Sequence, residues 1–264
     1  MARVHTTTVG DQGSWLVFCH GLFGQGRNWT GVAKALSDPA AGDPHRSLLV
    51  DLPHHGRSSW SEQVDYASLA DAVAEVLPTD APVTLVGHSM GGKVAMVLAL
   101  RHPELVTRLC VVDIAPVDYR GSTEFSAYVA AMRGLDLEAV HRRSDADEAL
   151  TEAVPDRTVR DFLLQNLRRD GEGWRWQVDL EGLGGGLDTI SGWPAQALAG
   201  RTFTGPVLWV AGGESRYVQP EHAAAMEELF PRHRKVTIKG AGHWVHAEKP
   251  DVFVEVLRRF TSAG

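Results

Sequence analysis

The sequence has few cysteines, no long apolar run and no signal peptide. Its only two cysteines, Cys19 and Cys110, lie in apolar runs typical of strands. They imply no disulfide framework and fit a reducing compartment. No apolar run approaches the roughly 18 residues of a membrane-spanning helix. The opening MARVHTTTVGDQGS has no apolar core of a signal peptide. We therefore expect a cytoplasmic protein without a membrane partner.

Positive charge is also scarce, with 26 Lys+Arg against 33 Asp+Glu and a net charge of −7. Phosphate binding needs a basic face, so we expect no nucleic-acid partner. Hydrophobic residues make up 44% and charged residues 22% of the 264 positions, which is ordinary for a globular chain and excludes extensive disorder.

Short apolar runs alternate with helical patterns along most of the chain. The runs barely alternate in polarity, which suits strands buried on both faces. They are 15–19, 48–52, 83–86, 109–114, 207–211 and 235–239. Helical spacing of apolar residues occurs in 67–77, 92–101, 221–230 and 250–260. This order predicts an α/β fold with a mostly parallel central sheet flanked by helices, with 4–9 as an antiparallel edge strand.

The alternation stops between residues 116 and 200. The pattern of this stretch is typical of helices and shows no apolar run of a buried strand. It contains 9 Arg, no Lys and 15 Asp+Glu, which give it a net charge of −6. We expect a helical cap, or lid, at 116–200, inserted into a core domain of 1–115 and 201–264. Segments in such positions commonly close active sites.

The strongest motif is Gly87-His88-Ser89-Met90-Gly91, which follows an apolar strand and opens a helix. This setting is the one that a nucleophile elbow requires, in which a tight turn projects the serine hydroxyl above the sheet. Ser89 is therefore the predicted nucleophile. The alternative is that Ser89 is a serine without a catalytic role in an ordinary strand–helix turn.

A serine hydroxyl needs a base to take its proton. His243, in Gly240-Ala241-Gly242-His243 after the last predicted strand, is the predicted base. His246 is the alternative, although packing suits it better. His88 should point away from Ser89 and pack. A metal site that gathers other histidines has no supporting ligand spacing, so we expect no metal. Those histidines are His20, His54, His55 and His222.

The acid that orients the base has two candidates. Asp113 follows the run 109–112, and Glu214 follows the run 207–211. Many enzymes of this kind place the acid after the later strand, in a G-x-x-D pattern. Here Ser215 holds the fourth position of that pattern and cannot serve, while Glu214 lies one residue early. We favour Asp113 and keep Glu214 as the alternative.

An oxyanion hole needs two backbone N–H groups. Met90 should supply one and Leu22 the other, with Phe23 as the alternative to Leu22. The same turn contains three glycines in the order G-x-x-G-x-G, which differs from the dinucleotide-binding order G-x-G-x-x-G. We therefore expect no nucleotide cofactor. The turn 51–58 contains Asp51, Arg57 and Ser58, which we interpret as mainly structural.

Together these motifs resemble the α/β-hydrolase superfamily over nearly the whole chain, and within it the YbfF-type esterase branch, which includes mitochondrial abhydrolase-domain relatives. The segments that carry the resemblance are 20–29, 51–58, 87–92, 112–116, 162–167, 176–183, 212–218 and 242–246. In that branch the acid follows the earlier strand, which independently supports Asp113. Pro53 and His54 depart from the arginine and asparagine that are usual in that branch, so we expect the local contacts of that loop to differ.

The resemblance implies a serine hydrolase, without a cofactor, that acts on small-molecule carboxylic esters or acyl thioesters. We expect short-to-medium acyl esters as substrates. The open alternatives are an acyl-CoA thioesterase, a perhydrolase with the same triad, a C–C bond hydrolase and a ligand receptor. No motif in the sequence predicts an oligomeric state. Aromatic side chains are the candidates for an apolar substrate pocket: Phe23, Phe125, Tyr128, Phe162, Trp193, Tyr217 and Trp244.

Overall fold

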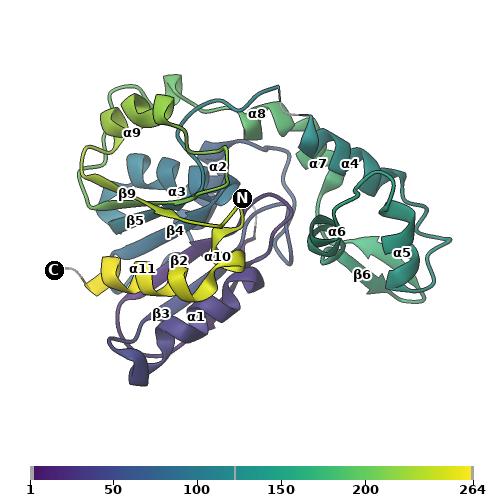
Figure 1. Cartoon of the computed structure of the whole chain (residues 1–264), viewed down its shortest axis with the longest axis horizontal. Coiled ribbons are helices and arrows are strands. Elements are labelled where there is room, and N and C mark those ends of the chain that lie inside the picture. Colours follow the sequence, from purple (N-terminus) through teal and green to yellow (C-terminus); the bar gives the residue numbers. More distant parts are fainter. Residues whose placement is uncertain (1–2, 122, 263–264) are drawn as a thin grey trace.

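A seven-stranded sheet forms the centre of the computed structural model, which describes residues 3–121 and 123–262 (Figure 1). The strands lie in the order β1-β3-β2-β4-β5-β8-β9. β1 pairs antiparallel with β3, and every other neighbour in this sheet is parallel. The strands are β1 (His5–Val9), β2 (Trp15–Cys19), β3 (Arg46–Asp51), β4 (Val83–His88), β5 (Val106–Val112), β8 (Val207–Gly212) and β9 (His233–Ile238).

The sheet confirms the predicted α/β class and the antiparallel edge strand. Every residue of β4 and β8 is buried, which explains why these runs show no alternation of polarity. Of the six positions of β9, three are exposed and two are half-buried, as expected for an edge strand. The run that we placed at 109–114 ends earlier, at Val112, and the chain then turns at Asp113.

Helices cover both faces of the sheet (Figure 1). On one face, α2 (Tyr66–Ala74), α3 (Met90–Arg101) and α9 (Ala223–Leu229) share a core with β2, β4 and β5. On the other face, α1 (Thr30–Ser37) and α11 (Pro250–Ser262) pack around Phe18 and Trp29, beside the short α10 (Val245–Glu248). The sequence patterns missed α1, whose N-cap is Trp29 and makes no side-chain capping bond.

Residues 116–200, called the inserted segment below, extend to one side of the sheet (Figure 1). Its helices are α4 (Glu124–Gly134), α5 (Arg143–Leu150), α6 (Arg157–Leu164), α7 (Leu180–Gly185) and α8 (Leu187–Ser191). It also contains an antiparallel hairpin of β6 (Leu167–Asp170) and β7 (Gly173–Trp176). An interpretation of helices alone missed this hairpin, because its arginine-rich strands are short and partly exposed and show no apolar run.

A helix that crosses a membrane must be both long and apolar. None of the helices within 3–121 and 123–262 meets both requirements.

The turn between β4 and α3 depends on close backbone approach. A Cβ atom on Gly91 would overlap the carbonyl oxygens of Cys19 and His20, and one on Gly87 would overlap the carbonyl oxygen of Gly91. All three neighbours are backbone atoms of buried segments, so none can move aside cheaply. The glycines at 87 and 91 therefore let β2, β4 and the start of α3 meet in one place.

We predict that Gly91→Ala destabilises the protein by about 1–3 kcal/mol, the usual cost of overpacking a core. Gly31→Ala is the matched control, because a Cβ at Gly31, inside α1, meets nothing within 4 Å. The control should gain up to about 1 kcal/mol from helix propensity. Urea denaturation measures both free energies of unfolding. Equal stability of Gly91→Ala and wild type would contradict this account of the turn.

Candidate active site

Ser89 occupies the apex of the β4–α3 turn in a strained backbone conformation. Its φ is 52° and its ψ is −122°, a combination that non-glycine residues rarely adopt. The Ser89 N–H donates to Val112 O at 3.0 Å, and the Ser89 carbonyl accepts from the N–H groups of Gly92 and Lys93. These bonds fix the turn from both sides, and Ser89 lines two cavities above the sheet.

His243 and Asp113 meet although 130 residues separate them. His243 Nδ1 lies 2.8 Å from Asp113 Oδ2. A carboxylate only accepts hydrogen bonds, so Nδ1 carries the proton and donates it. Nε2 of the neutral imidazole is then left as an acceptor. This tautomer is the one that a general base for a serine requires.

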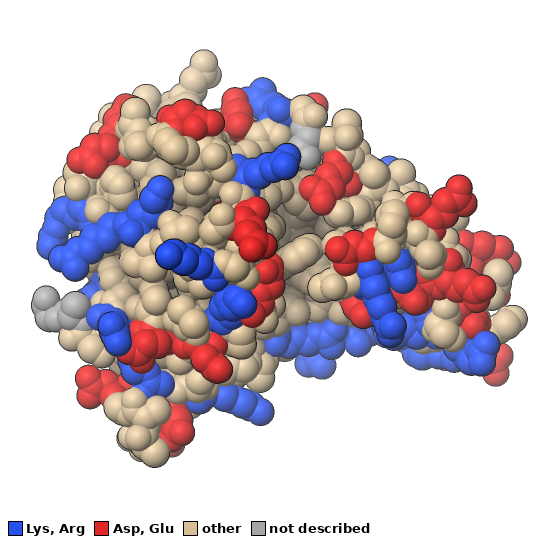
Figure 2. Space-filling model, viewed as in Figure 1, with Lys and Arg blue, Asp and Glu red and all other residues tan. Residues whose placement is uncertain are grey.

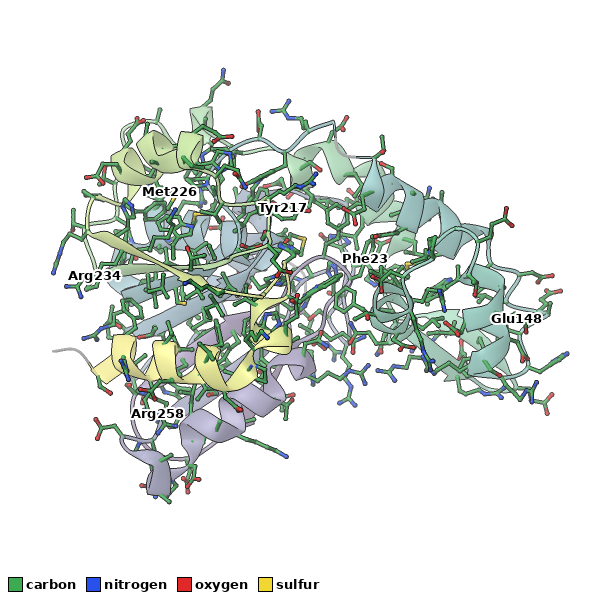
Figure 3. All side chains as sticks on the ribbon, viewed as in Figure 1. Phe23, Glu148, Tyr217, Met226, Arg234 and Arg258 are labelled. Atoms are coloured by element: carbon green, nitrogen blue, oxygen red, sulfur yellow. The ribbon has the colours of Figure 1, made fainter. Side chains whose placement is uncertain are left out.

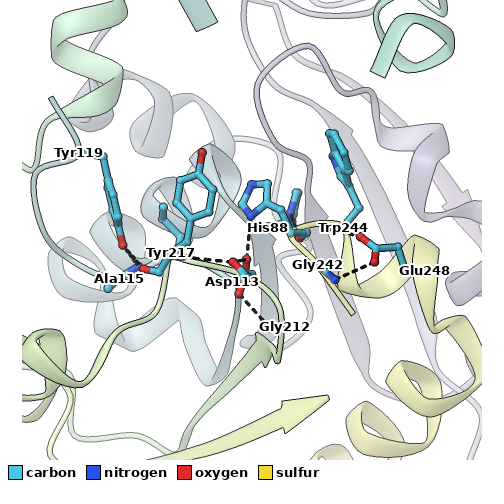
Figure 4. A network of polar contacts seen from close by, with 12 residues as sticks. His88, Asp113, Ala115, Tyr119, Gly212, Tyr217, Gly242, Trp244 and Glu248 are labelled. Atoms are coloured by element: carbon cyan, nitrogen blue, oxygen red, sulfur yellow. Dashed lines mark hydrogen bonds and ion pairs between the residues drawn. The ribbon is translucent and has the colours of Figure 1, made fainter. Parts of the chain in front are cut away.

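Asp113 is fully buried, and backbone and hydroxyl donors hold its carboxylate. Gly212 N–H donates to Oδ1 at 2.9 Å, and Ser215 Oγ donates to Oδ2 (Figure 4). Hydrogen bonds of this kind favour the charged carboxylate. Glu214, the alternative acid, is exposed on the surface. The geometry brings Asp113, and not Glu214, to the histidine.

Two further contacts hold the loop that carries His243. Glu248 accepts from the N–H groups of Gly242 at 2.7 Å and Trp244 at 3.1 Å, on either side of the histidine (Figure 4). His88 Nε2 donates to the His243 carbonyl at 2.9 Å. Burial, with the two neighbouring histidines, holds the pKa of His88 well below its usual range, so His88 stays a neutral donor.

His246 packs in the interior, as the sequence suggested. It lies in α10 and its ring stacks on Trp29 with ring centroids 4.1 Å apart. Burial lowers its pKa to about 3. A histidine that remains uncharged at this depth is a poor candidate for a base that must accept a proton, which leaves His243 as the base that the geometry favours.

The loop after β2 contains both candidate oxyanion donors that the sequence offered in this turn. Phe23 N–H donates to His55 Nε2 at 3.2 Å, so the alternative oxyanion donor is already occupied. Leu22 lines both cavities beside Ser89, and Met90 lines the larger one. The turn itself is closed by the bond from Gly24 N to Gly21 O.

Buried neutral histidines support this loop. His20 Nδ1 donates to Gly21 O at 2.8 Å, while its Nε2 accepts from Leu52 N. Burial lowers the pKa of His20 to about 4 and that of His55 to about 3. Because both rings stay neutral, each can donate with one nitrogen and accept with the other.

The two cavities meet at Ser89. The first has a volume of about 370 Å³ and extends over α3 toward α8. The second has a volume of about 160 Å³ and includes His243 in its wall. Leu22, Phe125 and Tyr217 line both cavities. Figure 3 shows Phe23 and Tyr217 near the place where the core and the inserted segment meet.

Most of the predicted aromatic residues face these cavities. Phe23, Tyr128, Phe162 and Trp244 line the smaller cavity, in addition to the shared Phe125 and Tyr217. The ring of Tyr217 also stacks on that of His243, with centroids 4.1 Å apart. Trp193 lies outside both linings and packs against the hydrophobic core. Its backbone N–H donates to the side chain of Asp118.

The turn 51–58 has the structural contacts that we expected of it. Asp51 accepts from the N–H groups of Gly26 at 2.7 Å and Arg57 at 2.9 Å, and Ser58 donates to the Asp51 carbonyl. The unusual His54 pairs with Asp179 of the inserted segment at 2.8 Å. His54 therefore joins this turn to the inserted segment.

A metal site in a protein needs a group of ligand side chains close together. Within 3–121 and 123–262, no three or more His, Cys, Asp or Glu side chains form such a group. Each of the four histidines considered for a metal site has a hydrogen bond to protein: His20, His54, His55 and His222.

Three contributors to the site escaped the sequence patterns. Ser215 was dismissed because it cannot act as an acid, yet it hydrogen-bonds Asp113. His88 anchors the backbone of His243. Lys93, which looks like an ordinary helical lysine, is 1% exposed and lines the larger cavity. The signal for Ser215 was its position, where related patterns place the acid.

Comparison with known proteins places the whole chain in one family. The family model for the α/β hydrolase fold matches residues 14–250. Mouse sn-1-specific diacylglycerol lipase ABHD11 is 39% identical over 251 residues, which are 93% of this chain and 80% of that protein. Esterase YbfF of Escherichia coli is 33% identical over 265 residues, or 98% of this chain and 97% of that one.

A solved structure agrees with these relatives. A marine microorganism esterase superposes with a TM-score of 0.90 at 29% identity, covering 98% of this chain and all of that one. The chain therefore belongs to the α/β-hydrolase family, in the branch that includes YbfF and ABHD11, and is a carboxylic ester hydrolase.

Proposed function

We propose that the chain hydrolyses short-to-medium acyl esters through an acyl-enzyme on Ser89. The observation that carries this proposal is the 2.8 Å contact between His243 Nδ1 and the buried carboxylate of Asp113, beside a strained serine that lines the same cavity as His243. The contact leaves Nε2 unprotonated, as a base for the hydroxyl proton.

In the proposed mechanism, Ser89 Oγ attacks the acyl carbon while His243 Nε2 takes its proton. The negative oxygen of the tetrahedral intermediate is stabilised by the N–H groups of Leu22 and Met90. His243 then gives the proton to the departing alkoxide. A water molecule, deprotonated by the same histidine, attacks the acyl-enzyme. The bond between the acyl carbon and Ser89 Oγ then breaks, and His243 returns the proton to Oγ as the acid is released.

The two cavities suggest where each half of the ester lies. The alkoxide must leave beside His243, because this residue protonates it. His243 belongs to the smaller cavity and not to the described lining of the larger one. We therefore assign the smaller cavity to the alcohol and the larger one, of about 370 Å³, to the acyl group.

We also propose that the inserted segment acts as a lid domain on a core of 1–115 and 201–264. Its residues Phe125, Tyr128 and Phe162 supply walls of the cavities, so its position controls access to Ser89. A cytoplasmic location is supported by Cys19 and Cys110, which are both free and buried.

Ser89→Ala should abolish hydrolysis of p-nitrophenyl esters, since the remaining groups cannot form an acyl-enzyme. We expect a loss of about 10⁴-fold or more in kcat, and for the wild type an optimum at short-to-medium acyl chains. Release of p-nitrophenolate measures both. Retained turnover in Ser89→Ala would exclude this nucleophile, and an optimum at long chains would overturn the proposed acyl length.

Asp113→Asn should lower kcat about 10⁴-fold, because an amide can favour the wrong histidine tautomer. Glu214→Gln is the matched control, a carboxylate-to-amide change at the exposed alternative acid, and should leave kcat within about twofold. The same p-nitrophenyl assay compares the two. A large loss in Glu214→Gln with a small one in Asp113→Asn would reverse the assignment.

An acyl thioester with a phosphate-rich leaving group is a second candidate substrate, as in acyl-CoA. A cavity of about 470 Å³ lies where the core meets the hairpin β6–β7. Basic side chains gather along the lower edge of the molecule in this region (Figure 2). The arginines in the lining are Arg27, Arg57, Arg168, Arg169 and Arg175. Burial and the neighbouring arginines lower the pKa of Arg168, which is typical of a cluster that a bound anion would stabilise.

Arg168→Gln should then raise KM for acyl-CoA about tenfold, the effect of losing one charged hydrogen bond. KM for an uncharged p-nitrophenyl ester of the same acyl chain should not change. Arg234→Gln, at an exposed position on β9, is the matched control and should change neither constant. An equal KM for acyl-CoA in both variants would argue against thioester recognition by the arginines.

A further inference from the structure

Lys93 places a positive charge in the wall of the cavity that we assign to the acyl group. It is 1% exposed and lies one helical turn beyond Ser89 on α3. Four residues of α-helix span about 6 Å. Ser89 and Lys93 line the same cavity of about 370 Å³, so a short acyl chain can lie between them.

The ammonium of Lys93 is only partly satisfied by the protein. Nζ donates to Gly192 O at 2.6 Å and to Ser191 O at 3.1 Å, at the end of α8. The rings of Tyr66 and Tyr119 face it, with centroids 5.6 and 4.9 Å from Nζ. An ammonium has three donor protons. Among the residues described, the two carbonyls account for two of them, which leaves one for a ligand.

The remaining charges of the cavity lie elsewhere on its wall. Glu124 and Arg216 also line it, but both are exposed. Their opposite charges leave Lys93 as the excess charge of the lining. The other wall groups named for this cavity are neutral and mostly apolar. A charge buried among apolar groups is costly unless it is paired. The two carbonyls are neutral, and the Asp118 carboxylate, which also acts on Lys93, is itself paired with Arg120.

We propose that Lys93 selects substrates whose acyl group ends in a carboxylate, so that the enzyme prefers monoesters of short dicarboxylic acids. This inference rests on the proposed ester hydrolysis at Ser89. The carboxylate would accept the free Lys93 proton in the buried end of the larger cavity. The ester carbonyl would then reach Ser89, and the alcohol would occupy the smaller cavity.

A matched set of esters tests the preference. Monoethyl succinate, glutarate and adipate are each paired with the ethyl ester whose chain ends in an isopropyl group in place of the carboxylate. The readout is the ratio of kcat/KM for the acidic ester to that for its neutral partner, measured by titration of released acid. In Lys93→Met we expect the best ratio to fall about tenfold or more, mainly through KM, as a charged hydrogen bond is lost.

Lys34→Met is the matched control, because Lys34 is an exposed lysine on α1. It should leave every ratio unchanged. The inference is overturned if wild type shows no preference for any acidic ester, or if Lys93→Met lowers both members of each pair alike. The latter result would mean that Lys93 only links α3 to the inserted segment and does not select the substrate.

The pH dependence of the wild type provides a second test that needs no variant. Burial lowers the pKa of Lys93 to about 7, so its charge is present below this pH and is lost above it. The ratio should therefore fall as pH rises through 7. Both esters of a pair use the same proposed triad, so any change in the triad cancels in the ratio. The other groups that face Lys93 are Tyr66, Tyr119, Asp118 and Arg120. Burial raises the pKa of both tyrosines, so they stay neutral in this range. A ratio that is constant from pH 6 to 9 would count against Lys93.

Binding separates this inference from the proposed function. Calorimetry of glutarate and monoethyl glutarate with Ser89→Ala needs no turnover. Weaker binding to Ser89→Ala/Lys93→Met than to Ser89→Ala would support the inference even if wild type hydrolysed no ester. Equal binding to both would overturn it even if neutral esters were hydrolysed.

Discussion

The turn at Ser89 is the constraint on which the rest of the site depends. A residue with φ of 52° costs about 1–3 kcal/mol in backbone strain and persists only where its surroundings enforce it. Here β4 and α3, both almost wholly buried, enforce it from either side. Because α3 starts immediately after Ser89, the direction of that helix also fixes the N–H of Met90 and the position of Lys93. A single strained residue thus sets the places of the proposed nucleophile, of one proposed oxyanion donor and of Lys93 in the larger cavity.

A second strained residue explains how the acid reaches the histidine from an earlier strand. Asp113 also has φ of 52°, and its carboxylate projects toward β8, where Gly212 and Ser215 donate to it. The position after β8 thus supplies a polar partner for Asp113, the proposed acid, rather than the acid itself. Serine suits this position because a hydroxyl can donate to a carboxylate, whereas an aspartate there would add a second negative charge.

The features that could be predicted from the sequence are those encoded by local patterns. Buried parallel strands and the elbow are contiguous, so apolar runs and glycine spacing identified them. The sequence favoured Leu22 over Phe23 as the proposed oxyanion donor, but the structural reason was not accessible, since it depends on His55, 32 residues away, which occupies the Phe23 N–H. Lys93 was missed for a similar reason. Its burial results from packing beneath α8, about 100 residues later, and nothing in GKVAMVLALR distinguishes it from a surface lysine. The hairpin β6–β7 was missed because each of its strands has only four residues, too few for the alternation of Trp174, Arg175 and Trp176 to indicate a strand.

The inserted segment contributes to the chemistry as well as to the walls of the cavities. Asn166 Nδ2 donates to the carbonyl of Phe23 at 2.8 Å, and its Oδ1 accepts from Gln25 Nε2. Both partners belong to the loop that carries Leu22, so the proposed oxyanion donor is held partly from the inserted segment. Movement of this segment away from the core would break these bonds together with those of Lys93 and His54. Opening of the proposed lid would therefore loosen the oxyanion loop, and closure over a substrate would restore it. The same contacts would then control both the access of a substrate to the site and the position of the proposed oxyanion donor.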